Sequence, residues 1–105
     1  MIARIWQSIA LTSKAVQYLE YLNRDIVPDY QKAIGNAGVF IMKNPCGELV
    51  HFLLLSFWAS EDSLALFVGP DLETVSPTAE EKRLLLAFES RASNYEILQI
   101  PEPEN

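Results

Sequence analysis

The side chains best suited to chemistry in this sequence are few and widely spaced. His51 is the only histidine, and histidine is the side chain that most often acts as a general base, so it is a candidate base. Cys46, the only cysteine, lies shortly before it across a turn. One histidine and one cysteine form no recognisable set of metal ligands, so we expect no metal site. A packed histidine and an unactivated thiol are the simpler alternatives.

Trp58 lies where a long apolar run passes into a helix. Leu49–Trp58 has the length and composition of a buried strand, and Ser60 is a good N-cap for a helix that begins with acidic residues and ends at Gly69. This junction places a large aromatic side chain at the mouth of any cavity between the sheet and its helices. Plain core packing of Trp58 is the alternative.

Three further segments have the apolar patterns of strands: Met1–Ile9, Val39–Asn44 and Tyr95–Ile100. After the first of them, Thr12 or Ser13 is expected to cap an amphipathic helix. Pro28 is expected to break or kink that helix, because proline lacks a backbone donor. The stretch 71–93 is ambiguous. Thr78 and Glu81 suit a capping box before a helix, whereas the apolar run 84–88 suits an extended chain equally well.

The expected order of elements is β-α-β-β-α-β. This order is typical of the ferredoxin-like α+β sandwich, in which both helices cover one face of an antiparallel sheet. The length of 105 residues fits a single domain over residues 1–100, followed by a polar tail over 101–105.

The strand Leu49–Trp58 is apolar on both faces, so both faces should be buried. Helices can cover only one of them. A second copy of the same sheet is the simplest cover for the other, and we therefore expect a homodimer whose sheets pair into an α+β barrel. Residue parity puts His51 on the face opposite Trp58, toward that barrel, and Arg4 is expected to pair across the dimer.

Composition excludes several other functions. Eight basic residues against fourteen acidic ones give a net charge of −6, with no basic cluster for nucleic acid. No apolar run is long enough to span a membrane, and the first residues lack the pattern of a signal peptide. A lone cysteine suits a reducing compartment, so we expect a cytoplasmic protein.

Segments along most of the chain carry a resemblance to a known family: MIARIW at the start, VPDY at 27–30, GNAGVFIM at 35–42, FLLLSFWASEDSLALF at 52–67 and NYEIL at 94–98. The chain resembles the antibiotic biosynthesis monooxygenase-like group of dimeric α+β barrels. The resemblance implies a pocket in each protomer between the sheet and its helices. Some members oxidise aromatic polyketides or quinols with dioxygen and no metal or flavin, some degrade haem, and many have no assigned activity.

Haem-degrading members use an asparagine on the first strand, a tryptophan at the junction after the third strand, and a histidine on the following helix. Trp58 matches the tryptophan, and Gln7 stands at the asparagine position. No histidine follows the junction, because His51 is the only one in the chain. Haem degradation is therefore not expected, and no cofactor is implied.

Cofactor-free oxygenases of this group need a dry aromatic pocket, a base or hydrogen-bond partner, and a group that holds an oxyanion. The resemblance thus implies candidate catalytic residues at Gln7, His51 and Trp58. It implies candidate substrate-binding residues at Tyr18, Tyr30 and Phe67. Tyr18 also lies in the apolar stripe of the first helix, so core packing is its alternative.

Three functions stay open at this point. The first is a small oxygenase that acts without a cofactor on an aromatic or quinol-type molecule. The second is a non-catalytic dimeric module that binds a small ligand in the same pocket, and the third is a structural module whose pocket is filled by its own side chains. Polar groups that converge on a cavity of aromatic size would favour the first, a purely apolar cavity the second, and a sealed core the third.

Overall fold

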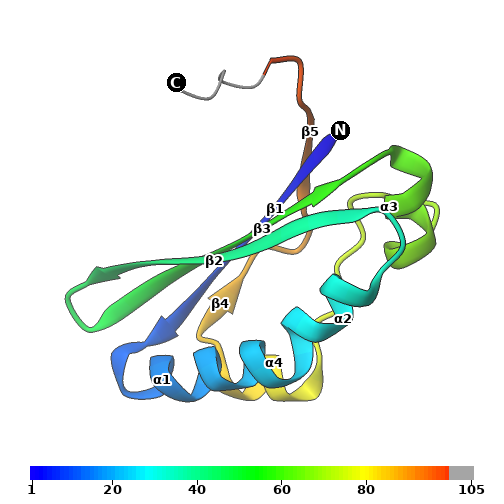
Figure 1. The fold of residues 1–105 in the computed structure, drawn as a ribbon. Coiled ribbons are helices and arrows are strands. Elements are labelled where there is room, and N and C mark those ends of the chain that lie inside the picture. Colours follow the sequence, from blue (N-terminus) through cyan, green and yellow to red (C-terminus); the bar gives the residue numbers. More distant parts are fainter. Residues whose placement is uncertain (100–105) are drawn as a thin grey trace, which may run out of the picture.

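An antiparallel five-stranded sheet forms the body of the molecule (Figure 1). In the computed structural model, which describes residues 1–99, the strand order is β2-β3-β1-β4, and β5 also pairs with β1. The strands are β1 (Ile2–Leu11), β2 (Asn36–Cys46), β3 (Leu49–Trp58), β4 (Ala87–Phe88) and β5 (Ser93–Glu96). This arrangement confirms the predicted ferredoxin-like α+β class. The expected tail at 101–105 lies outside the described residues.

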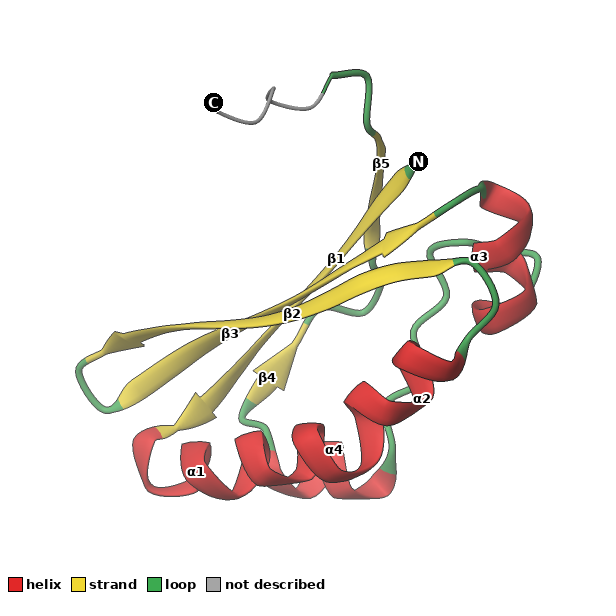
Figure 2. Ribbon diagram, viewed as in Figure 1, coloured by secondary structure: helices red, strands yellow, loops and turns green. Residues whose placement is uncertain are grey.

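The helices lie on one side of the sheet (Figure 2). They are α1 (Thr12–Tyr21), the π-helical segment η1 (Leu22–Ile26), α2 (Val27–Lys32), α3 (Glu61–Val68) and α4 (Ala79–Leu84). In the view of Figure 2, α1, α2 and α4 run beneath the sheet, while α3 packs at the end where β3 leaves it. No helix in the described part of the chain is long and apolar enough to cross a membrane.

The junction after β3 folds as its sequence predicts. β3 spans Leu49–Trp58, and Ser60 caps α3 by accepting a hydrogen bond from the Ser63 amide, 3.1 Å away. Gly35 lets this region close, because its φ of +82° suits glycine and because a Cβ there would lie 2.3 Å from Cβ of Ser63. The start of α3 therefore packs directly against the turn that leads into β2.

The first helix differs from its prediction at both ends. It begins at Thr12 with Leu11 as N-cap, and neither Thr12 nor Ser13 provides a side-chain cap. The Thr12 amide instead donates to the Glu48 carbonyl at 2.8 Å, so the hairpin turn after β2 satisfies this helix end. At the other end Pro28 lies in the first turn of α2, directly after η1. Proline cannot donate to the preceding turn, and the helix changes pitch there.

The ambiguous stretch 71–93 contains both predicted conformations. Thr78 and Glu81 form the capping box of α4, which ends at Leu84. The chain then becomes extended, and Ala87 and Phe88 form β4 beside β1. The last strand is shorter than predicted and begins earlier, at Ser93. Two short strands thus share the edge of β1 that one strand was expected to fill.

The two faces of the sheet have different surroundings. Even-numbered residues of β1 and β3 face the helices and are buried, including Trp6, Phe52 and Trp58. Odd-numbered residues point to the other face and are half-buried or exposed. We call this second surface the open face, and its largest exposed side chain on β2 is Phe40. No described helix covers the open face (Figure 1).

Candidate functional site

A cavity of about 230 Å³ lies between the sheet, α2, α3 and the start of α4. The loop 74–78 closes one side of it. Its polar lining consists of Arg4, Asp29, Tyr30, Thr74, Ser76, Thr78 and Glu81. Its apolar lining consists of Trp6, Ile26, Leu54, Phe67, Val68, Val75 and Pro77. The cavity is thus neither sealed nor purely apolar, and cation, hydroxyl and carboxylate groups converge on it.

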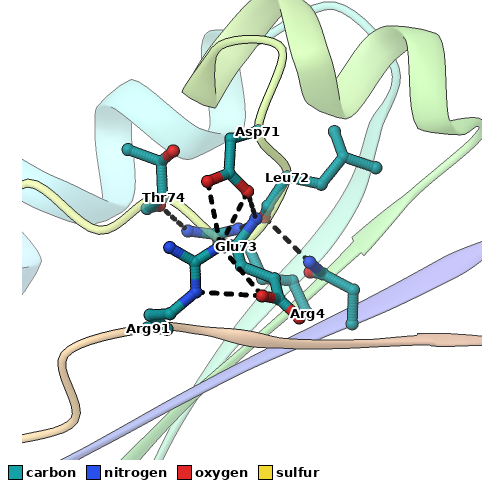
Figure 3. Close-up of polar contacts among 7 residues, drawn as sticks. Arg4, Asp71, Leu72, Glu73, Thr74 and Arg91 are labelled. Carbon is teal, nitrogen blue, oxygen red and sulfur yellow. Dashed lines mark hydrogen bonds and ion pairs between the residues drawn. The ribbon is translucent and has the colours of Figure 1, made fainter.

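Arg4 brings a buried positive charge to the sheet side of this cavity. Its side chain is on the helix-facing side of β1 and the residue is only 5% exposed. The guanidinium donates to the backbone carbonyls of Leu72 and Thr74 (Figure 3). No carboxylate in the described part of the chain forms an ion pair with it. The expected pairing of Arg4 across a dimer is therefore wrong, because residue parity turns it toward the helices.

The loop that Arg4 holds is fixed from its other side as well. Arg91 pairs with Asp71 and Glu73 at 2.9 Å in each case (Figure 3). Asn94 of β5 donates to the Leu72 carbonyl at 2.8 Å, which is the same carbonyl that accepts from Arg4. These contacts fix the backbone of 71–74 against the sheet and leave 74–78 to line the cavity.

The phenol of Tyr30 in α2 and the guanidinium of Arg4 affect each other's pKa. Burial raises the pKa of the Tyr30 phenol, the positive charge of Arg4 opposes that rise, and Glu81 adds to it. Burial also lowers the pKa of Arg4, and Tyr30 opposes that change. A guanidinium stays charged under any ordinary condition, and Tyr30 stays neutral near pH 7. The pair thus offers a cation and a hydroxyl donor to a ligand oxygen.

Tyr30, Phe67 and Trp58 form an aromatic cluster on this side of the cavity. The Phe67 centroid lies 4.8 Å from that of Tyr30 and 5.0 Å from that of Trp58. Trp58 is completely buried and donates through Nε1 to Oγ of Ser56 at 3.0 Å. It does not line the cavity itself, because Tyr30 and Phe67 stand in front of it. Trp58 therefore supports Tyr30 and Phe67, the two rings that line the cavity, from within the core.

The helix side of the cavity carries a buried carboxylate. Glu81 is 7% exposed, and its Oε1 accepts from the Thr78 amide at 3.1 Å. The Thr78 hydroxyl in turn lies 2.6 Å from the Tyr21 hydroxyl. Burial raises the pKa of Glu81, and the hydrogen bonds from Thr78 oppose that rise. The cavity therefore has a cation on its sheet side and a carboxylate on its helix side.

The candidate site residues lie on both faces of the sheet, and His51 is opposite Trp58 as residue parity predicts. Tyr30 and Phe67 line the cavity, and Trp58 packs behind them. Gln7 and His51 are exposed on the open face, so the sheet stands between them and Trp58. A pocket shared by Gln7 and Trp58 is therefore wrong for the single chain, because odd and even residues of a strand point to opposite faces.

Tyr18 belongs to a different part of the core. Its ring packs edge-on against Phe52, with centroids 4.9 Å apart, and the residue is 1% exposed. Burial raises the pKa of its phenol, and a hydrogen bond with Ser8 opposes the rise. Tyr18 is not among the residues that line the cavity. Its position fits the core-packing alternative.

Sequence reasoning missed Arg4, Trp6 and Glu81. Arg4 and Trp6 lie on the same face of the sheet as Trp58, because the antiparallel register pairs Arg4 with Ser56 and Trp6 with Leu54. The sequence predicts that these residues share a face of the sheet with Trp58, but it does not predict which face packs against the helices. Glu81 was recognised only as part of a capping box. Among residues 1–99 no cluster of three or more His, Cys, Asp or Glu side chains could hold a metal ion.

The fold matches solved structures, although their sequences are distant. No family model matches this sequence, and no curated protein does. A protein of Deinococcus radiodurans, described as a candidate antibiotic biosynthesis monooxygenase, matches with a TM-score of 0.72 at 14% identity over 100% of both chains. The ActVA-Orf6 monooxygenase of Streptomyces coelicolor, in complex with nanaomycin D, matches with a TM-score of 0.64 at 12% identity over 98% of this chain and 92% of that one.

A haem-degrading protein has the same fold. MhuD of Mycobacterium tuberculosis, solved with two haems in its active site, matches with a TM-score of 0.57 at 14% identity over 97% of this chain and 100% of that one. The resemblance expected from the sequence is thus confirmed for the fold. Proteins of this fold bind ligands as different as nanaomycin D and haem, and fold alone does not assign a reaction.

Proposed function

We propose that this protein oxidises a small phenol or quinol with dioxygen, without a metal or flavin, in the cavity beside Arg4 and Tyr30. The observation that carries this proposal is the buried guanidinium. Arg4 is held on the cavity wall by two backbone carbonyls and has no carboxylate partner among the described residues. A preorganised cation in a water-poor site stabilises negative charge that develops during a reaction.

The reaction needs only the substrate, dioxygen and a base. A base removes the hydroxyl proton, and the phenolate gives one electron to dioxygen. In a phenol with a hydrogen on the ring carbon opposite the oxygen, the two radicals combine at that carbon, which forms a new C–O bond and a peroxide anion beside Arg4 and Tyr30. After the peroxide gains a proton, loss of water removes the hydrogen on that carbon and leaves a second ring carbonyl. One oxygen atom thus enters the product and the other leaves as water.

The aromatic lining supports the same substrate class. Phe67 and Trp6 offer apolar surfaces to a planar ring, and Tyr30 offers both a ring and a hydroxyl. A monooxygenase of this fold binds nanaomycin D, which is consistent with an organic ligand here. His51 lies on the open face, and the sheet separates it from this cavity, so it cannot act as the base here.

A homodimer is part of this proposal. The open face carries half-buried apolar side chains on β1 and β3, and Phe40 and Met42 of β2 are 55% and 44% exposed. Contiguous apolar surface of this kind usually marks a protein interface. A second copy that packs its own open face there would bury both sheets and would also enclose Gln7 and His51. We place this dimer in the cytoplasm, because Cys46 is a free, exposed thiol.

The main alternative is a homodimeric module that binds a ligand without turning it over. The same cavity supports that function, since binding requires only shape and polar partners. A structural module with a filled pocket is less well supported, because the cavity is open and polar. Turnover separates the enzyme from the binding module.

Oxygen uptake tests the proposal directly. Purified protein is incubated with a panel of one- and two-ring phenols and quinols, with an anaerobic control. We expect uptake above the uncatalysed rate for at least one compound and a drop of about 10²–10³-fold in Arg4→Met, because one stabiliser of the oxyanion is lost. Failure of every compound to raise uptake, with binding intact, would leave the binding module as the function.

A further inference from the structure

Glu81 is the only carboxylate of the cavity wall that is buried. The residue is 7% exposed, whereas Asp29, which also lines the cavity, is exposed to solvent. Oε1 accepts from the Thr78 amide at 3.1 Å, and Thr78 is the only residue among the described ones that hydrogen-bonds this carboxylate. Glu81 is one of the residues that line the cavity. An acceptor thus faces the space that a ligand would fill.

The capping box fixes this carboxylate in place. Thr78 accepts from the Glu81 amide at 3.1 Å while Glu81 accepts from the Thr78 amide at the same distance. These reciprocal bonds hold the side chain at one end and leave little freedom for the carboxylate. A base held in this way is oriented before a substrate arrives, which is the requirement for efficient proton transfer.

The surroundings also suit a base rather than a salt-bridged carboxylate. The titratable groups that interact with Glu81 are Tyr18 and Tyr21 of α1 and Tyr30 of α2, and Thr78 hydrogen-bonds it. Arg4 and Asp29 line the same cavity. None of the described cations forms an ion pair with Glu81. Burial raises its pKa from the ordinary value of 4.5. A carboxylate becomes a stronger proton acceptor when its pKa rises.

Cavity size limits the ligand that can lie between Arg4 and Glu81. A cavity of about 150 Å³ takes up benzene, and pockets for drug-sized ligands begin at about 300 Å³. The value here, about 230 Å³, lies between these two. A ligand of one or two fused rings therefore has the size that this cavity holds.

We propose that Glu81 is the general base of this cavity and that its substrate is a phenol of one or two rings, bound with the hydroxyl at Glu81 and the opposite ring carbon toward Arg4 and Tyr30. This inference rests on the proposed function for its chemical setting. The step is a proton transfer: the O–H bond of the phenol breaks, a new O–H bond forms on Glu81, and the electron pair stays on the phenolate. Glu81 later gives the proton to water, and the peroxide takes up a proton from water at the other side of the ring.

The chain offers a clean variant for this proposal. In Glu81→Gln the side-chain amide oxygen still accepts from the Thr78 amide, because glutamine serves at this position of a capping box as well as glutamate. The fold should survive, and the base is lost. Glu80→Gln is the matched control, since it makes the same charge change one residue away on an exposed residue paired with Arg83.

The first readout does not depend on turnover. The probe is 4-nitrophenol, a single-ring acidic phenol whose phenolate absorbs visible light, in a mildly acidic buffer where the free probe is protonated. We expect wild-type protein and Glu80→Gln to bind it with the phenolate spectrum and, by calorimetry in two buffers, without release of a proton to solvent. Glu81→Gln should bind it with the neutral spectrum. No binding to wild type at millimolar probe, or equal phenolate in Glu81→Gln, would overturn the proposal.

The second readout separates this inference from the proposed function. With a compound that supports oxygen uptake, Glu81→Gln should lower kcat by about 10²–10⁴-fold and remove the acid limb of the pH profile, while Glu80→Gln stays within twofold. If wild type takes up no oxygen but transfers the probe proton as described, the oxygenase fails and the base assignment stands. If Glu81→Gln retains full uptake, the base assignment fails and the oxygenase stands.

Discussion

The two faces of the sheet use the same strands for different purposes. On the helix side, β1 and β3 present Arg4, Trp6 and Trp58, which are nearly or fully buried. On the open face the intervening residues are mostly aliphatic and only half-buried, with Gln7 and His51 exposed among them. The buried side thus contains a charge, and the exposed side is largely apolar. This is the reverse of what a single soluble sheet would favour.

The difference indicates that each face has a separate partner. A buried guanidinium needs polar groups, and the loop 71–74 supplies two carbonyls for it. An apolar face needs a cover, and the described chain supplies none. We interpret the helix side as the ligand site and the open face as the surface for a second copy.

Replacement of Trp58 should lower the free energy of unfolding more than replacement of a residue on the open face. Trp58→Ala removes a completely buried ring and its contact with Phe67, so the free energy of unfolding should fall by about 3–5 kcal/mol. Urea unfolding followed by circular dichroism measures this. Phe57→Ala changes the neighbouring residue on the open face and should cost less when the protein is dilute enough to be monomeric. Equal losses in the two variants would contradict the division between the faces.

A charge on the open face should separate the dimer. Leu53→Glu puts a carboxylate at the middle of β3 on that face, and we expect the dissociation constant to rise by about a hundredfold, or roughly 2.8 kcal/mol. Sedimentation equilibrium measures it. Leu66→Glu is the control, because Leu66 of α3 is 77% exposed away from the sheet. A wild-type monomer at micromolar concentration would refute the dimer itself.

Replacement of Arg4 should affect both the loop and Tyr30. Arg4→Met leaves the carbonyls of Leu72 and Thr74 without their donor, so the free energy of unfolding should fall by about 1–3 kcal/mol. It also removes the charge that opposes the raised pKa of Tyr30, so that pKa should rise further in a spectrophotometric titration. Arg91→Met, on the exposed side of the same loop, should leave the tyrosine titration unchanged.

The pH dependence of stability should reveal Glu81. The pKa of Glu81 is raised in the folded state, so the folded protein binds this proton more tightly than the unfolded chain does. Its contribution to the free energy of unfolding is therefore full below pH 4.5 and declines as pH rises toward the folded-state pKa. Relative to wild type, Glu81→Gln should gain stability as pH rises through that window. Thermal melts of both proteins across the window measure the difference, and parallel curves would contradict it.

Much of the fold was predictable from local patterns. β3 and α3 have the bounds that the apolar run and the cap at Ser60 predict, because both depend on neighbouring residues. The start of α1 was not predictable in this way. Its backbone is satisfied by the Glu48 carbonyl, which is distant in sequence. The stretch 71–93 was ambiguous because its elements are short and form only against β1 and α1.

The site was only partly predictable. Tyr30 and Phe67 were identified as lining residues, and the structure brings them to the cavity. Gln7 was assigned to the same pocket as Trp58 through resemblance, although its parity differs from that of Trp58. Arg4 and Glu81 come from β1 and α4, and only the closed fold brings them to one space. No spacing along the chain joins a residue of the first strand to one of the last helix.

Side-chain period and local capping were enough to predict β1, β3 and α3 and to show that β3 is apolar on both faces. Tertiary structure alone decided which face carries the helices. That choice places Arg4, rather than Gln7, beside the aromatic rings and turns His51 away from them. The physical reason is that a strand offers its alternate residues to opposite sides, and only packing against helices determines which side becomes the cavity.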